Sequence, residues 1–528
     1  MILAYDFIYV SPNAVLENYL YLIASQAKQE FYIKKQNKKI TLFVRGEEEA
    51  LKTFSDRLAA EAPLSIFLRG VTARIAENWN IEESSAIKAC FAPLGFSPRS
   101  LIAAKKSGDW TIKPEIGAAK ALENMPPIDS AVESLSGGGA IEISGSYRLF
   151  ALENRAYNPN AVIMPTDIGY ISEIAIAKTE DINALGSIER SILRLPTNLI
   201  FQSKYPALPR LIGIALAGDL YLYLLSLKLA EKGVKAIVLE DYDHIEVVAL
   251  ETQNLIASGL GFSPSLDRFF TIKEPYFRAF GAAIDERDLR GEANLGFFLS
   301  VENDDRFMFN APKTGAIELL KIDLPTSIAD IFAAIEQSGE SGAKLISNYR
   351  EKYGDIIGAI ESATFENAPK NVASLWALAG LILGFDLDIK SAFNKTLEYI
   401  AFCAMPKSPI IDYKLNNNAI DPLPFFRSAI SYKLAGTPDE LIAYGMCESL
   451  IYFLSDLVDI IVSKSVAGAS LIKTRNADRF LAALNIETPE NIFLLGSLFS
   501  CKALSQLALK HIAPNRKLYF PNALPLEF

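Results

Sequence analysis

The spacing of apolar residues along the first 61 positions alternates between the period of a strand and the period of a helix. Residues 2–9 and the alternating run 40–44 predict two strands, whereas residues 16–28 and 47–61 carry apolar side chains at helical spacing. Strands and helices that follow one another in this order predict a compact α+β unit at residues 1–85.

The pattern changes twice along the rest of the chain. Residues 86–126 combine mixed signals with several prolines, which is typical of a loop-rich connector. Residues 127–206 again show strand and helix signals, and from residue 207 to residue 528 apolar helices alternate with short apolar runs. This mixture favours layered α/β domains, so we expect a multidomain protein of the α/β and α+β classes.

Length and composition agree with several packed domains. The chain has 528 residues, of which 50% are hydrophobic and 22% charged. At about 100–200 residues per domain, this length predicts about three or four domains. The 62 acidic residues exceed the 52 basic ones, and the resulting net charge of −10 gives no general attraction for phosphate backbones. Nucleic acid is therefore not an expected partner.

Cysteine and histidine usage limits the metal chemistry. The 4 cysteines show no C-x-x-C spacing, and the 2 histidines, His244 and His511, are far apart, so neither a metal site nor a cofactor is predicted. The N-terminus has no basic leader, and the most apolar stretches are interrupted or shorter than the roughly 20 residues that a bilayer requires. We therefore expect a cytoplasmic protein without membrane insertion.

Four motifs, in order along the chain, carry a resemblance to a known family. They are the loop Val10–Glu17, the run Ala140–Leu149, the segment Asp421–Phe425 and the stretch Leu495–Cys501. Together they resemble the HypF type of hydrogenase maturation carbamoyltransferase. That family joins an acylphosphatase-like domain, two zinc fingers, a YrdC-like domain and a carbamoyltransferase domain of the ASKHA (actin/hexokinase-like) superfold. The resemblance implies an acylphosphatase-like domain at 1–85, a connector in place of the zinc fingers at 86–126, a reduced YrdC-like domain at 127–206 and an ASKHA carbamoyltransferase-like domain at 207–528.

The same resemblance implies that charged groups of carbamoyl transfer have been replaced. The substituted family positions are Glu17, Lys35, Glu142, Asn158, Ala377 and Cys501. Glu17 stands where the family holds a phosphate with an arginine, and an acidic side chain repels an acyl phosphate instead of binding it. The connector contains a single cysteine, Cys90, which implies that both zinc fingers are absent. The histidine-rich metal motif of the family is absent as well.

Other matched positions keep the family's residue type only in part, as at Arg155, Ser187 and Arg190. The candidate vestigial nucleotide-binding residues are Arg155, Ser187, Arg190, Gly496 and Ser497. Leu299 and Ser300 stand for the Leu-Asp pair that opens a further nucleotide loop in the family. No residue is assigned a catalytic role.

These features predict a HypF-like pseudoenzyme, a non-catalytic accessory or scaffold protein in [NiFe] hydrogenase maturation that binds a hydrogenase subunit or another maturation protein. The alternative is a divergent carbamoyltransferase or other nucleotide-binding enzyme that uses Ser187, Arg190 and a glycine turn at 137–139. Such an enzyme needs a metal or a strong cationic clamp, because phosphoryl chemistry depends on electrostatic stabilisation. The aromatic segment Lys517–Phe528 is the candidate partner surface, with packing on the last domain as the alternative. The sequence gives no indication of the oligomeric state.

Overall fold

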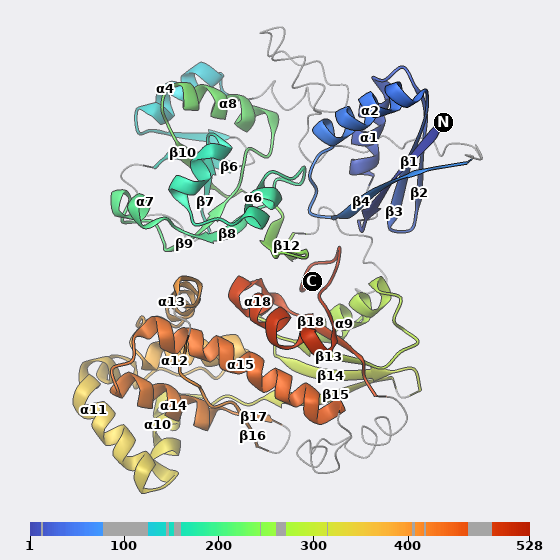
Figure 1. The fold of residues 1–528 in the computed structure, drawn as a ribbon. Coiled ribbons are helices and arrows are strands. Elements are labelled where there is room, and N and C mark those ends of the chain that lie inside the picture. Colours follow the sequence, from blue (N-terminus) through green and yellow to red (C-terminus); the bar gives the residue numbers. More distant parts are fainter. Residues whose placement is uncertain are drawn as a thin grey trace. The chain divides into compact units, whose positions relative to one another are not determined.

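The computed structural model divides the chain into two compact units, Met1–Ser265 and Leu266–Phe528, and each unit is described by itself (Figure 1). The residues that the structure describes are 1–11, 14–77, 125–143, 147–152, 160–242, 244–259, 271–313, 315–403, 407–416, 419–462 and 488–528. Within this part of the chain, no helix is long and apolar enough to cross a bilayer.

The first unit begins with a four-stranded antiparallel sheet of order β2-β3-β1-β4. Its elements are β1 (Ile2–Tyr9), α1 (Val15–Ser25), β2 (Glu30–Gln36), β3 (Lys39–Arg45), α2 (Glu48–Glu61) and β4 (Leu68–Ile75). The strands and helices predicted from the apolar spacing are present as β1, β3, α1 and α2. The helix α2 buries Leu51, Phe54 and Leu58, which lie at helical spacing along one face.

A six-stranded sheet of order β5-β6-β10-β7-β9-β8 follows in the same unit. Its strands are β5 (Ala140–Ile143), β6 (Tyr147–Ala151), β7 (Val162–Pro165), β8 (Leu193–Pro196), β9 (Leu211–Ile214) and β10 (Ala236–Glu240). Strands β9 and β10 come after residue 206, and β10 pairs with both β6 and β7 near the centre of the sheet. The domain division expected between residues 206 and 207 therefore cuts through this sheet, and the first unit continues to Ser265.

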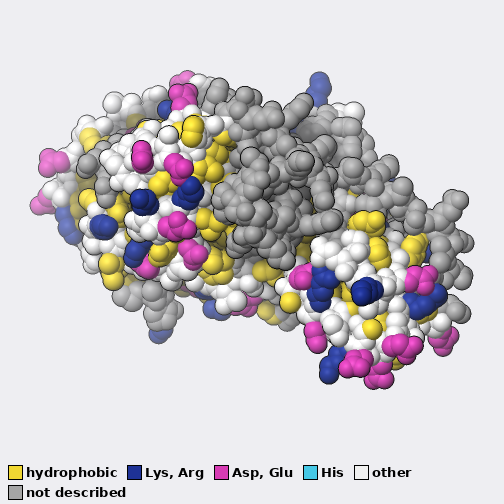
Figure 2. All heavy atoms as spheres, turned by 90° about the horizontal axis from the view of Figure 1, so that it is seen from above, with side chains coloured by type: hydrophobic (Ala, Val, Ile, Leu, Met, Phe, Trp, Pro, Cys, Tyr) yellow, Lys and Arg dark blue, Asp and Glu magenta, His cyan; other side chains and the backbone are white. Residues whose placement is uncertain are grey.

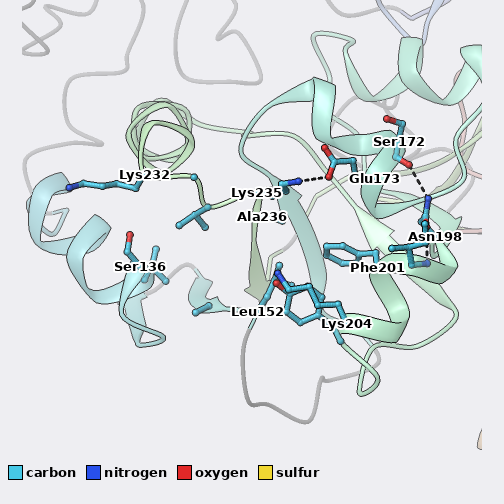
Figure 3. A pocket seen from close by; sticks show the side chains of 16 residues that line it. Ser136, Leu152, Ser172, Glu173, Asn198, Phe201, Lys204, Lys232, Lys235 and Ala236 are labelled. Carbon is cyan, nitrogen blue, oxygen red and sulfur yellow. Dashed lines mark hydrogen bonds and ion pairs between the residues drawn. The ribbon is translucent and has the colours of Figure 1, made fainter.

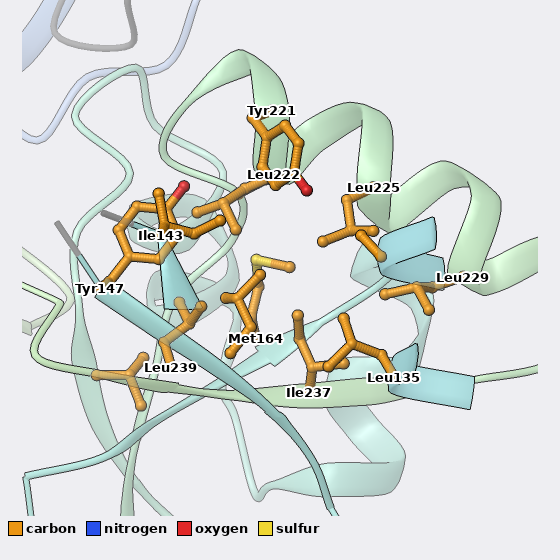
Figure 4. Close-up of a cluster of buried hydrophobic side chains, with 14 of the residues drawn as sticks. Leu135, Ile143, Tyr147, Met164, Tyr221, Leu222, Leu225, Leu229, Ile237 and Leu239 are labelled. Atoms are coloured by element: carbon orange, nitrogen blue, oxygen red, sulfur yellow. The ribbon is translucent and has the colours of Figure 1, made fainter. Parts of the chain in front are cut away.

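Two helices, α4 (Ile128–Ser136) and α8 (Leu220–Glu231), pack on this sheet through a continuous hydrophobic core (Figure 4). Leu222, Leu225 and Leu229 of α8 are fully buried, and they meet Met164 of β7 and Ile237 of β10. Burial of each large apolar side chain contributes about 1.5–3 kcal/mol. The shorter elements of this unit are η2 (Ile168–Tyr170), α5 (Ile171–Ile174), α6 (Thr179–Leu185), α7 (Leu199–Lys204), β11 (Glu246–Ala249) and β12 (Asn254–Ser258).

The second unit contains a seven-stranded mixed sheet of order β16-β17-β15-β14-β13-β18-β19. Its strands are β13 (Asn294–Phe298), β14 (Arg306–Ala311), β15 (Gly315–Ile322), β16 (Lys414–Asn416), β17 (Ala419–Asp421), β18 (Asn491–Leu495) and β19 (Lys517–Tyr519). Strands β13, β14 and β15 are antiparallel neighbours, whereas β18 runs parallel to β13. Because β13 and β18 are parallel neighbours, the turns that follow them leave the sheet at the same edge.

The helices of the second unit include α12, in which every residue is buried. They are α9 (Pro275–Glu286), α10 (Ile328–Gln337), α11 (Glu340–Ile360), α12 (Val372–Ile382), α13 (Ile389–Phe402), α14 (Pro422–Leu434), α15 (Asp439–Val462) and α18 (Lys502–His511), together with the short η3 (Ser497–Ser500) and η4 (Ala513–Asn515). The apolar composition of α12 reflects this position inside the unit, where a helix meets apolar neighbours on all sides.

The end of the chain packs into the second unit. Phe520 and Leu526 are fully buried, and the Leu526 carbonyl accepts a hydrogen bond of 2.8 Å from the Gly496 N–H. Arg278 and Arg287 donate to the carbonyls of Phe528 and Phe520, each at 2.9 Å. Most of the segment Lys517–Phe528 is therefore part of the core, which supports the alternative of packing on the last domain over a partner surface.

Candidate functional site

The first pair of substituted family positions forms an ion pair. Lys35 Nζ on β2 lies 3.0 Å from Glu17 Oε2 on α1, and the two side chains are only 19% and 17% exposed. The ammonium group also lies 5.5 Å from the centre of the Tyr9 ring. The acid at position 17 thus neutralises the nearby cation, and the pair presents no net charge to an incoming phosphate.

Residues 187–190, between α6 and β8, hold two of the candidate nucleotide-binding side chains. The Ser187 hydroxyl is buried and donates to the Ala184 carbonyl at 2.7 Å. Arg190 adopts a φ of 49°, which is strained for a residue other than glycine, and its buried Nε atom has no hydrogen-bond partner in the described chain. Burial lowers the pKa of Arg190, and the tyrosines Tyr19, Tyr223 and Tyr242 act in the opposite direction. Both side chains are directed into the protein.

Glu189, between these two residues, connects the two sheets of the first unit. Its carboxylate is fully buried and accepts hydrogen bonds from Ser65 Oγ at 2.5 Å and from the Ile66 N–H at 3.0 Å. Burial raises the pKa of Glu189, and the hydrogen bonds from Ser65 and Ile66 partly oppose that rise. The sequence did not indicate this role, because a lone glutamate is more often exposed.

Tyrosines fill the space next to Arg190. Tyr147 donates to Asp219 Oδ2 at 2.6 Å, and Asp219 in turn accepts from the Leu222 N–H at the start of α8. A Cβ atom at Gly218 would lie 1.9 Å from the Tyr242 hydroxyl, so a larger residue at this position clashes. Burial raises the pKa of both Tyr147 and Tyr242, which keeps their phenols protonated. The Gly218 position beside Tyr242 is therefore closely packed.

The remaining candidates of the first unit have no common site. Glu142 is exposed on β5 and pairs in register with Arg148 of β6. Arg148 forms ion pairs with Glu240 at 3.1 Å and Asp241 at 2.9 Å. The glycine turn at 137–139 ends α4, and Gly139 donates to the Ser134 carbonyl at 2.8 Å. Arg155 and Asn158 lie outside the described residues.

A cavity of about 590 Å³ opens elsewhere in the first unit (Figure 3). Its lining includes three lysines, Lys204, Lys232 and Lys235, and one carboxylate, Glu173, which pairs with Lys235. The lining is therefore positively charged, although the whole chain is acidic and the face drawn in Figure 2 intermixes both signs. Apolar side chains at the rim complete a lining suited to an anionic ligand with an apolar part. None of the sequence-predicted site residues that the structure describes lines this cavity.

The apolar rim of the cavity comes from α7. Ile200, one of the lining residues, is 82% exposed, and the adjacent Leu199 is 64% exposed. The Lys204 ammonium lies 5.0 Å from the centre of the Tyr205 ring. Exposed aliphatic side chains next to lysines are typical of surfaces that bind other molecules.

In the second unit, the two turns that resemble nucleotide loops lie together. Gly496 has a φ of 95°, and a Cβ atom there would lie 2.1 Å from the Leu299 carbonyl oxygen, so this close approach requires glycine. The Leu498 N–H donates to the Leu299 carbonyl at 3.0 Å, and Ser497 Oγ accepts from the Val301 N–H at 2.9 Å. The parallel pairing of β13 with β18 thus brings Ser300 and Ser497 to one edge of the sheet.

The carboxylate of Glu527 occupies the space between these two turns. It accepts hydrogen bonds from Ser300 Oγ at 2.8 Å, from the Ser497 N–H at 2.9 Å and from the Asn303 side-chain amide. We call this arrangement of donors the 300–497 cradle: Ser300, Asn303 and the Ser497 N–H. The sequence did not indicate Glu527, because its donors are distant along the chain.

The last two substituted positions are structural. Ala377 lies in the buried helix α12. Cys501 precedes α18 next to Cys447, and a hydrogen bond from Cys447 lowers the pKa of the Cys501 thiol. Among the described residues, no three His, Cys, Asp or Glu side chains are grouped so that they could hold a metal ion.

Comparison with known proteins gives one related sequence and a shared fold. No family model matches the chain. The chain is 24% identical to Protein HydE of Wolinella succinogenes, over an alignment of 528 residues that covers 92% of each chain. The crystal structures of T. kodakarensis HypF and of full-length HypF in the phosphate- and nucleotide-bound form each superpose with a TM-score of 0.54 and 11% identity, covering 100% of this chain and 96% of the HypF chain. The expected HypF-like character is confirmed: the sequence is similar to that of HydE, and the fold resembles that of HypF.

Proposed function

We propose that this HypF-like chain is a non-catalytic accessory or scaffold protein in the maturation of [NiFe] hydrogenase, and that it acts in the cytoplasm by binding a hydrogenase subunit or another maturation protein. The sequence relation to HydE, which extends over 92% of both chains, supports a shared role. The order of an acylphosphatase-like, a YrdC-like and an ASKHA-like domain is part of the same proposal.

The observation that carries the proposal is the arrangement at residues 187–190. The Ser187 hydroxyl donates to the Ala184 carbonyl, and the partly buried Arg190 guanidinium interacts electrostatically with nearby tyrosines. A catalytic clamp has to present its cations to the substrate phosphate before the reaction begins. The ion pair of Glu17 with Lys35 adds a second family position whose charge is used internally.

The partner surface in this proposal is α7 with the lysine-lined cavity beside it. Leu199 and Ile200 supply exposed apolar area, and Lys204 and Lys232 supply positive charge. The matching partner segment is acidic and carries at least one large apolar side chain, because opposite charges orient a partner and apolar burial supplies affinity.

A complementation experiment tests the proposal. Cells that lack the native protein receive either the Leu199→Ser/Ile200→Ser double variant or a control variant, Leu387→Ser/Ile410→Ser, whose wild-type side chains are 62% and 68% exposed in the second unit. We expect the α7 variant to keep the wild-type thermal transition, to lose co-purification with the hydrogenase subunit and to lower hydrogenase activity at least about tenfold, equivalent to about 1.4 kcal/mol of binding. The control variant keeps both properties. Equal behaviour of the two variants contradicts this partner surface.

The alternative function is a divergent carbamoyltransferase or other nucleotide-binding enzyme. It predicts release of pyrophosphate from ATP when carbamoyl phosphate is present, and it predicts that Arg190→Ala abolishes that release. We expect no release above the buffer blank from the wild-type protein. Turnover that depends on Arg190 would establish the enzyme instead of the scaffold.

A further inference from the structure

We propose that Glu527 is an intramolecular ligand: its carboxylate fills an anion-binding site, the 300–497 cradle, which takes up a small singly charged carboxylate when Glu527 is replaced. This inference concerns the second unit alone and does not depend on the proposed function. Glu527 supplies both carboxylate oxygens, Oε1 to Ser300 Oγ and Oε2 to the Ser497 N–H. The donors come from two turns that are far apart along the chain, since Val301 and Ser497, which join them by a hydrogen bond, are 196 residues apart.

The cradle is held in place by bonds that do not involve Glu527. The buried Asp305 accepts from the Ser300 N–H and from the Val372 N–H, both at 2.7 Å. The Asn371 side-chain amide donates to the carbonyls of Val301 at 3.2 Å and Asn303 at 2.9 Å. These bonds fix the turn after β13 to the start of α12, so the donors remain in position when the carboxylate of Glu527 is absent.

The turn after β18 is also held by hydrogen bonds that do not involve Glu527. The Val301 N–H donates to Ser497 Oγ, and the Leu498 N–H donates to the Leu299 carbonyl. The two turns therefore stay joined by their own hydrogen bonds. A site whose donors are preorganised binds its anion without the cost of ordering them.

The surroundings select a small, singly charged ligand. The donors of the cradle are a hydroxyl, a side-chain amide and a backbone N–H, all of which are neutral. Burial raises the pKa of Asp305 well above its ordinary value, and the nearby Glu527 charge acts in the same direction. A second negative charge in the cradle would add to this repulsion, so a monocarboxylate fits better than a doubly charged phosphate.

Chemical rescue of the full-length Glu527→Ala variant by acetate tests the proposal. This substitution removes CH₂–COO⁻, and acetate has the same size and charge as the removed group. The thermal midpoint is followed by circular dichroism. Sodium acetate is compared with sodium chloride and with inorganic phosphate at equal ionic strength, and Glu351→Ala, which removes an exposed glutamate of α11, is the matched control.

We expect Glu527→Ala to have a lower midpoint than the wild type, and acetate to restore it saturably, whereas chloride does not. The wild type and Glu351→Ala respond equally to acetate and chloride. The proposal is overturned if acetate and chloride act alike on Glu527→Ala, or if the wild type responds to acetate as the variant does. Rescue by phosphate that equals rescue by acetate overturns the choice of a singly charged carboxylate.

A second variant covers the case in which Glu527→Ala does not fold. Glu527→Gln keeps the shape of the side chain but turns an NH₂ group toward one of the donors, so it loses a hydrogen bond and leaves no space for acetate. We expect this variant to respond to acetate no more than to chloride, because its side chain still fills the cradle. A thermal midpoint of Glu527→Gln that acetate raises saturably overturns the proposal.

Discussion

Two glutamates, one in each unit, hold segments that are distant in sequence, and they differ in how far solvent reaches them. Glu189 is fully buried and accepts from Ser65 and Ile66, whereas Glu527 is partly exposed and accepts from the 300–497 cradle. Both carboxylates satisfy neutral donors that would otherwise be unpaired. The difference indicates that a carboxylate bonded to neutral donors gives a permanent structural connection when it is buried from solvent. The same bonds give an exchangeable anion site when the carboxylate lies at the partly exposed edge of a sheet.

Glu189→Ala gives the largest expected effect on stability in this comparison. The substitution leaves the Ser65 hydroxyl and the Ile66 N–H without an acceptor, and a buried unsatisfied group costs about 1–3 kcal/mol. We expect a loss of about 2–3 kcal/mol in unfolding free energy, measured by urea denaturation, and no rescue by acetate. The control is Glu133→Ala, which removes an exposed glutamate of α4. Rescue of Glu189→Ala by acetate would remove the distinction between the two sites.

The pH dependence of stability is a second test of the buried glutamate Glu189. Burial raises the pKa of Glu189 in the folded protein, so the folded state holds its proton more tightly than the unfolded state does. The stabilising contribution is complete below the unfolded pKa, about 4.3, and is lost as pH rises from there through the folded pKa. We expect Glu189→Gln to lose this fall in unfolding free energy. The fall is measured from about pH 4, where the unfolded glutamate begins to ionise, up to about pH 7. An unchanged profile would contradict the assignment.

Asp6, whose pKa is shifted in the opposite direction, serves as the internal control for that experiment. Burial alone would raise the pKa of Asp6, but hydrogen bonds from Lys39, Thr41 and Arg74 lower it overall. Its contribution to stability is therefore present above the unfolded pKa, about 3.9, and is lost as pH falls through the folded pKa. We expect Asp6→Asn to weaken acid unfolding of the first unit, as measured by circular dichroism, and to leave the profile above neutral pH unchanged.

Glu17 forms an ion pair with Lys35, and we expect this pair to have a smaller effect on the unfolding free energy. A double-mutant cycle with Glu17→Ala and Lys35→Ala measures their interaction, which we expect to be about 0.5–1 kcal/mol because the pair is partly exposed and screened by solvent. Salt should reduce this coupling but not the effect of Glu189→Ala. A coupling of zero would show that the two charges are independent in solution.

The lysines of the cavity should contribute least to stability. Lys204 and Lys232 line the cavity beside exposed surface, so Lys204→Ala and Lys232→Ala should change the unfolding free energy by less than about 0.5 kcal/mol. Their expected effect is on binding of an acidic partner, measured by titration with the purified hydrogenase subunit. A large loss of stability would show that the cavity is part of the structural core.

The sequence predicted the helices and strands of residues 1–61 because each has one buried and one exposed face. Strands β2 and β4 were not predicted, because most of their side chains are partly or fully exposed and no alternation marks them. The division at residue 206 was wrong for the converse reason: β9 and β10 are buried strands, and their continuous apolar runs resemble the start of a new core.

The candidate site was predicted only in part. The resemblance located Ser187, Arg190 and Ser497, but not the carboxylates beside them, because the hydrogen bonds of Glu189 and Glu527 span 124 and 227 residues. No local pattern distinguishes these acids from exposed ones. The sequence left the segment Lys517–Phe528 open between core and interface, because an aromatic, weakly charged stretch is equally typical of both.

The contact between Gly218 and Tyr242 restricts the order in which mutations can accumulate. A side chain at position 218 collides with the Tyr242 hydroxyl, so replacement of Gly218 is tolerated only after Tyr242 has become smaller. Removal of the Tyr242 ring first, in turn, opens a void beside Tyr147, whose ring centre lies 5.8 Å away. Each single step is therefore destabilising, so the two positions change at low cost only together or with compensating substitutions.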